Sequence, residues 1–198
     1  DGELMDRFCQ APAATSLHHA YLGGLLEHTL SLLRAAESLL PHYPQVNRDV
    51  VLMGLFLHDL GKAHELHWNT GFAYSDDGQL VGHIARGVTI LDRKAEEVEH
   101  DDEGPGKLPG PLLRVLEHVI LSHHGVPEFG ALKIPATPEA IFISILDNLD
   151  AKMNLALGET RSAAAERKAQ LGGGHFTEKL WALNTRLYRP DPTTADDD

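Results

Sequence analysis

The sequence predicts an all-α protein, a helical bundle interrupted by one small loop or hairpin. Leucines recur at helical spacing between residues 22 and 40, and this segment ends at two prolines. Residues 50–60 are apolar almost all round, as in a buried helix. Helical spacing returns in residues 80–98, 112–124 and 141–157. A chain of 198 residues is expected to fold as one domain.

Breaks between the predicted helices are marked by capping residues, glycines and prolines. Asp49 is a predicted N-cap, and Gly61 suits a left-handed turn at a helix end. Residues 67–79 combine Gly, Asp and aromatic side chains and predict a loop with a small hairpin. Residues 101–111 and 126–138, rich in Gly and Pro, predict surface connections.

Composition and charge exclude several classes of protein. No run of about 18 apolar residues is present, so no membrane span is predicted. The net charge of −12 argues against nucleic-acid binding over a broad surface, because proteins normally bind phosphate backbones with Lys and Arg side chains. Cys9 is the one cysteine, so no internal disulfide can form, and we expect a cytoplasmic location.

Histidine and aspartate side chains fall where a helical core would bury them. The chain has 13 histidines, and His28, His58, Asp59 and Asp147 lie inside apolar helical segments. Burial of such groups without partners is costly, and a divalent cation would satisfy them together. These donors fit Mn, Fe or Co better than Mg. We prefer Asp147 over Asp150 as the late ligand, a preference that depends on the resemblance described below.

Adjacent positions on one helix diverge by about 100°, so we do not expect His58 and Asp59 to act as a simple chelating pair. We expect His58 to bind one cation and Asp59 to bridge to a second, with His83, His123 and His124 completing that site. Two such cations can share a hydroxide and hydrolyse a phosphoester by in-line attack. The remaining histidines are assigned no role, because a lone helix-end histidine is more often structural.

Lys62 follows Asp59 by one short turn. We expect its ammonium group to reach a substrate phosphate as an additional point charge. Asp59 and Lys62 are therefore the predicted catalytic residues.

The order of these residues resembles the signature of HD-domain phosphohydrolases. The signature is a first His (His28), a His-Asp doublet in an HDxGK context (residues 58–62) and a late Asp (Asp147). His83 and the His123-His124 pair resemble the additional histidines of binuclear members.

Longer strings resemble the bacterial YhaM-type 3′→5′ exoribonucleases within that superfamily. The strings are HHAYLGGLLEHT (18–29), DGQLVGH (77–83), LSHHG (121–125) and LDNLDAKM (146–153). This resemblance implies single-stranded RNA, or DNA, as the substrate and two divalent cations, with Mn favoured and Fe, Co or Ni as alternatives. Members usually carry an N-terminal OB-fold, so this chain is expected to be either the HD part alone or a short homologue.

We therefore expect a linker at 1–14, an HD domain at 15–158, a helical extension at 159–190 and a disordered acidic tail at 191–198. Two alternatives remain open. An HD hydrolase of nucleotides or other small phosphate esters would use the same ligands, whereas a non-catalytic regulatory HD module would be expected to have lost some of them.

Overall fold

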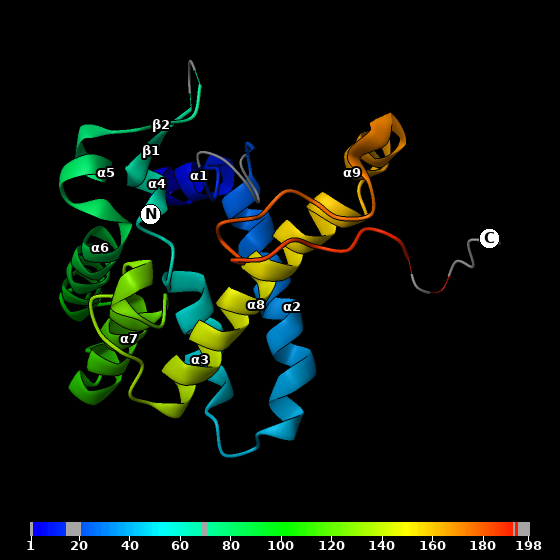
Figure 1. Ribbon diagram of the computed structural model, residues 1–198. Helices are drawn as coiled ribbons and strands as arrows, with labels where there is room; N and C mark the ends of the chain where they lie inside the picture. The colour runs from blue at the N-terminus through cyan, green and yellow to red at the C-terminus, as the bar shows by residue number, and fades with distance from the viewer. Residues whose placement is uncertain (1, 15–20, 69–70, 192, 194–198) are drawn as a thin grey trace. The chain divides into compact units, whose positions relative to one another are not determined.

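The computed structural model describes residues 2–14, 21–68, 71–191 and 193, which divide into two compact units, Asp1–Asn148 and Leu149–Asp198. The all-α prediction is confirmed (Figure 1). In chain order the helices and strands are α1 (Gly2–Gln10), α2 (Gly24–Leu39), α3 (Arg48–Leu57), α4 (Lys62–Glu65), β1 (Leu66–His67), β2 (Ala73–Tyr74), α5 (Asp76–Leu80), α6 (Gly82–Glu99), α7 (Gly110–Ser122), α8 (Pro138–Thr160) and α9 (Ala163–Lys168). Among the described residues, no helix combines the length and the apolar character that crossing a membrane requires.

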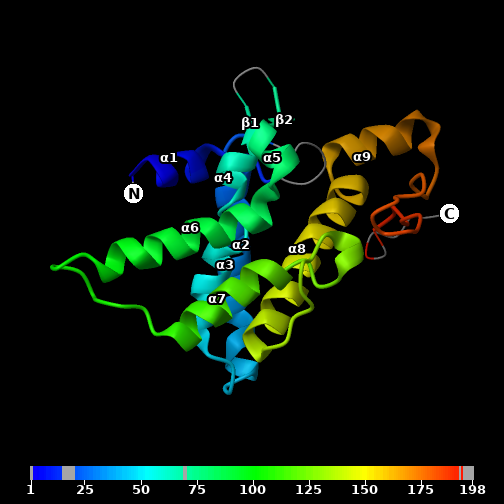
Figure 2. The ribbon, with the colours of Figure 1, turned by 90° about the vertical axis from the view of Figure 1, so that its left-hand side faces the viewer.

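The core of the first unit is built from helices that pack in pairs. Helix α3 packs against both α2 and α7, and α7 packs along α6, as Figure 2 shows. Residues Ala140, Ile143 and Leu146 of α8 join the buried side chains of α2 and α3. The helices that carry the predicted site residues are therefore held together by two apolar clusters, to both of which α2, α3 and α7 contribute.

The N-terminal residues differ from the prediction. Residues 1–14 are predicted as a linker, but Gly2–Gln10 form α1. Leu4 and Phe8 lie four positions apart, share one face of this helix and are buried in the core of the first unit. The Phe8 ring lies 5.4 Å from that of Phe56. Burial of this apolar stripe stabilises α1 and makes it part of the domain.

The hairpin prediction is confirmed, but the loop around it is shorter than predicted. β1 pairs with β2 in antiparallel orientation. Residues 76–80, predicted as loop, form α5, because the Ser75 hydroxyl accepts a hydrogen bond from the Gly78 amide at 2.9 Å and caps the helix.

Two further local predictions are wrong. Helix α3 is capped by Asn47, whose side chain accepts hydrogen bonds from the amides of Asp49 and Val50, so Asp49 is not the cap. Gly61 is right-handed, with φ −61°. Glycine at this position allows the backbone to pack closely against α6, because a Cβ atom there would lie 2.0 Å from the His83 carbonyl oxygen.

The second unit begins within α8, whereas the sequence predicts a boundary after residue 158. The predicted helical extension, 159–190, is only partly helical. α9 and one π-helical turn (Ala169–Gly173) are followed by a loop in which Phe176 bridges to Tyr188 and Leu180 to Thr185. Most of the predicted tail, residue 192 and residues 194–198, lies outside the described residues.

Candidate metal centre

The first cluster consists of His28, His58 and Asp147, which come from three different helices or helix ends. His28 lies on α2, His58 is the C-cap of α3, and Asp147 lies on α8. One potential ligand atom of each residue lies within 4.8 Å of the others. His28 Nε2 lies 3.2 Å, and His58 Nε2 3.9 Å, from Asp147 Oδ1.

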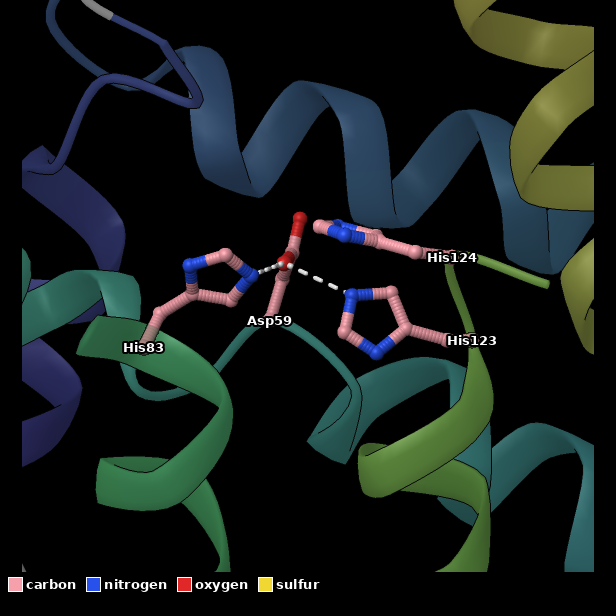
Figure 3. A group of neighbouring side chains, drawn as sticks. All are labelled: Asp59, His83, His123 and His124. Atoms are coloured by element: carbon pink, nitrogen blue, oxygen red, sulfur yellow. Dashed lines mark ion pairs between the residues drawn. The ribbon is translucent and has the colours of Figure 1, made fainter. Parts of the chain in front are cut away.

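The second cluster consists of Asp59, His83, His123 and His124, shown in Figure 3. His83 lies in the first turn of α6, and the two adjacent histidines follow the end of α7. Asp59 Oδ1 is 3.6 Å from both His83 Nε2 and His123 Nε2. Gly125, with φ 82°, turns the chain away directly after His124, a conformation that favours glycine.

Asp59 lies between the two clusters. Its Oδ1 faces the second cluster, whereas its Oδ2 lies 3.4 Å from His58 Nε2 and 3.9 Å from His28 Nε2 in the first. Asp59 therefore reaches both clusters, and it shares the first with the adjacent His58. The divergence expected for neighbours on one helix does not apply, because α3 ends at Leu57 and both residues lie in the turn that follows.

Backbone carbonyls orient two of the buried imidazoles. His58 Nδ1 lies 2.6 Å from the Leu55 carbonyl oxygen, and His123 Nδ1 lies 2.8 Å from that of Ile120. A carbonyl oxygen only accepts, so Nδ1 carries the proton in both rings. Nε2 is left with a lone pair that faces the cluster, which is the form that binds a metal.

Several buried polar atoms of these clusters have no hydrogen-bond partner within the described part of the chain. They are His58 Nε2, Asp59 Oδ1, His83 Nε2, His123 Nε2 and His124 Nδ1. Buried polar groups without partners cost free energy, and so many at one place need a common explanation. The donor set of imidazole nitrogens and carboxylate oxygens fits one or two divalent first-row cations.

The pKa shifts keep the clusters in the protonation state of metal ligands. Burial lowers the pKa of His58 to about 4 and that of His124 to about 3. Burial alone would raise the pKa of Asp59 and Asp147, but neighbouring cationic and imidazole groups outweigh it and lower both. Neutral His58 and His124 therefore coexist with ionised Asp59 and Asp147 at neutral pH.

Lys62 contacts the shared carboxylate. Its Nζ lies 2.7 Å from Asp59 Oδ2, and its side chain is mostly buried. Burial would lower the pKa of Lys62, but the Asp59 carboxylate outweighs that effect and raises it. The ammonium is thus charged and placed at the centre. Its predicted contact with a substrate phosphate stays a prediction.

Glu65 is a site residue that the sequence analysis missed. Its Oε1 lies 2.9 Å from His83 Nδ1 and accepts a hydrogen bond from the His83 amide at 3.2 Å. A carboxylate on the far nitrogen of a ligating histidine fixes the ring and raises its basicity. Glu65 ends the single turn of α4, and no periodicity distinguishes it from a surface glutamate.

All seven predicted ligands thus fall into the two clusters, and Asp150 falls into neither. The Asn154 side-chain amide donates to Asp150 Oδ2 at 3.0 Å, one turn further along α8.

One class of metal-binding helical proteins shares this arrangement. Its helices bring a first His, a His-Asp doublet and a late Asp together at one centre. The sequence profile described as HD domain matches residues 25–152, and the chain belongs to this family. No solved structure matches the chain.

Curated relatives are similar along most of this chain. Proteins named 3'-5' exoribonuclease YhaM from Bacillus licheniformis and Bacillus subtilis are each 40% identical over 184 residues, which is 92% of this chain and 54% of theirs. The Geobacillus protein of the same name is 38% identical over 185 residues, 93% of this chain and 52% of its own. The chain spans about half the length of the curated relatives it matches.

Proposed function

We propose that the two clusters bind a pair of divalent cations and that the chain hydrolyses phosphodiester bonds, removing nucleotides from the 3′ end of single-stranded RNA. The observation that carries the proposal is the position of Asp59, which directs one carboxylate oxygen at each cluster. The names of the relatives, similar along 92% of this chain, support the polarity and the substrate.

In this proposal His28, His58 and Asp147 hold one cation, and His83, His123 and His124 hold the other, with Asp59 shared. We propose manganese, with iron, cobalt or nickel as alternatives, because imidazole and carboxylate donors suit these metals. When bound, two such cations polarise the scissile phosphate and activate water for in-line displacement. Glu65 keeps His83 oriented, and Lys62 exchanges its contact with Asp59 for one with the substrate phosphate.

The charge of the chain supports a role for cations at the site. A net charge of −12 repels a polyanionic strand, so local positive charge at the reacting phosphate is needed. We also propose DNA as a second substrate and a cytoplasmic location, the latter supported by the single cysteine.

The test is cleavage of 5′-labelled single-stranded RNA by metal-stripped protein, with and without added Mn²⁺. We expect a Mn-dependent ladder of products shortened from the 3′ end. The variants His58→Ala and Asp59→Ala should abolish it, whereas His42→Ala, which changes an exposed histidine outside both clusters, should not.

A parallel assay uses bis-p-nitrophenyl phosphate. Hydrolysis of this small ester without RNA cleavage would support the proposed metal centre and would favour a small phosphate ester as the substrate. Inactivity on both substrates at full metal occupancy would refute the catalytic proposal and favour a regulatory module.

A further inference from the structure

The loop formed by residues 176–188 exposes three large aromatic side chains. Phe176 is 48% exposed, Tyr188 52% and Trp181 80%. Apolar side chains that lie together on an exposed surface, as Phe176 and Tyr188 do, mark candidate binding sites. We refer to Phe176, Trp181 and Tyr188 as the aromatic platform.

The loop is held by hydrogen bonds that leave these rings outside. Thr177, only 1% exposed, donates its amide to the Leu187 carbonyl and accepts from the Leu187 amide on its hydroxyl, both at 2.9 Å. Arg186 Nε donates to the Thr177 carbonyl at 2.8 Å. A second bridge, between Leu180 and Thr185, closes the turn that carries Trp181. The platform therefore rests on an ordered scaffold.

Two rings of the platform and an arginine lie next to each other. The centroids of Phe176 and Tyr188 are 5.3 Å apart, and the Arg186 guanidinium carbon lies 6.0 Å from the centre of the Phe176 ring. Lys179 lies exposed on the same loop. Aromatic faces combined with Arg and Lys are the elements with which proteins stack bases and contact phosphates.

The charge of this part of the chain differs in sign from the rest. Residues 149–190 contain seven Lys and Arg against four Asp and Glu, whereas residues 1–148 contain 10 against 21. The four aspartates of residues 191–198 bring the whole second unit to seven basic against eight acidic residues, so the excess of positive charge is confined to residues 149–190. A polyanion is attracted to that segment, which carries the platform, and repelled by residues 1–148.

We propose that the aromatic platform binds single-stranded RNA by stacking bases on Trp181 and on the Phe176–Tyr188 pair, with Lys179 near the phosphates. The inference rests on the proposed nuclease function and adds to it a binding site for the strand that lies entirely within the second unit. Single-stranded RNA is favoured over an apolar protein partner because the rings are interleaved with basic side chains, and over duplex because stacking requires free base faces.

The test is the affinity of Asp59→Asn protein for a fluorescein-labelled single-stranded RNA, measured by anisotropy in the presence of Mn²⁺ with intact RNA verified on a gel. Trp181→Ala should weaken binding by about 5- to 150-fold, the range expected for loss of one base–aromatic stack. Trp181→Phe should retain most of the affinity, whereas Trp181→Leu should lose it as Ala does. Phe129→Ala, which removes an aromatic ring 63% exposed on the first unit, should have no effect.

Salt dependence supplies a second readout. Lys179→Gln should lower the steepness of log affinity against log salt by about 0.7, the value for one phosphate contact with a single strand. Equal affinities of Trp181→Ala and the parent, or full affinity in Trp181→Leu, would overturn the inference. A change in oligomeric mass on Trp181→Ala with unchanged RNA binding would also overturn it, in favour of a protein partner. Failure of the nuclease proposal would instead appear as wild-type protein that binds RNA and does not cleave it.

Discussion

Replacement of Glu65 by Ala tests whether the carboxylate next to His83 serves the metal centre. Glu65 Oε1 is the acceptor for both His83 Nδ1, at 2.9 Å, and the His83 amide, at 3.2 Å. Loss of a carboxylate behind a ligating histidine typically lowers metal affinity by about 10- to 100-fold, or about 1.4–2.8 kcal/mol. His83 belongs to the second cluster, so we expect this loss in one of two binding events.

Calorimetric titration of metal-stripped protein with Mn²⁺ resolves this prediction. Glu65→Ala should weaken one event and leave the other unchanged. Glu65→Gln keeps an oxygen that can accept both hydrogen bonds and removes the charge, so its affinity should lie between those of Glu65→Ala and the wild type. Glu128→Ala, at an exposed position outside the clusters, is the matched control and should bind as the wild type does. Equal weakening of both events, or unchanged affinity in Glu65→Ala, would refute the reasoning.

Three further predictions concern stability. Phe8→Ala should lower the free energy of unfolding by about 3–5 kcal/mol in urea titrations, because a fully buried ring is lost from the core, and a loss below about 1 kcal/mol would show that α1 is dispensable. Gly61→Ala should lower the free energy of unfolding by about 1–3 kcal/mol or more, because its Cβ atom would lie 2.0 Å from the His83 carbonyl oxygen. A free energy of unfolding equal to that of the wild type, measured by chemical denaturation, would contradict that close approach. Metal-free protein should lose stability as pH falls from about 6.5 toward about 4, because His58 and His124 have lowered pKa values and the unfolded chain binds more protons. A melting temperature measured in EDTA that stays constant across this range would exclude that linkage.

Much of the fold follows from periodicity. The buried faces of α2, α3, α6, α7 and α8 repeat apolar residues at helical spacing over long segments, and such patterns predict helices well. The approximate ends of these helices were predictable from Pro and Gly. The N-cap of α3 was not, because Asn47 and Asp49 are both good capping residues and only the backbone conformation decides between them.

Short or tertiary features could not be predicted in the same way. Helix α1 has little more than two turns, and its Leu4 and Phe8 become informative only once a core exists to receive them. Residues 176–188 have an amphipathic pattern that is compatible with a helix, yet hydrogen bonds across Thr177 close them into a loop.

The candidate site was likewise predictable only in part. The order of the His and Asp residues, together with its resemblance to HD-domain proteins, was enough to name the residues of both clusters. The position of Asp59 between them was expected from divergence along one helix, but α3 ends at Leu57, so the turn that follows the helix sets this position. Glu65 could not be found, since its contact with His83 joins residues 18 apart through the packing of α4 against α6.

The most direct test of the central claim is anomalous X-ray scattering from crystals of Mn²⁺-loaded protein. The account predicts two manganese peaks, one bound by His28, His58 and Asp147 and the other by His83, His123 and His124, each in contact with a different oxygen of Asp59. A single peak at full occupancy, or two peaks of which one does not contact Asp59, would contradict the shared-carboxylate centre.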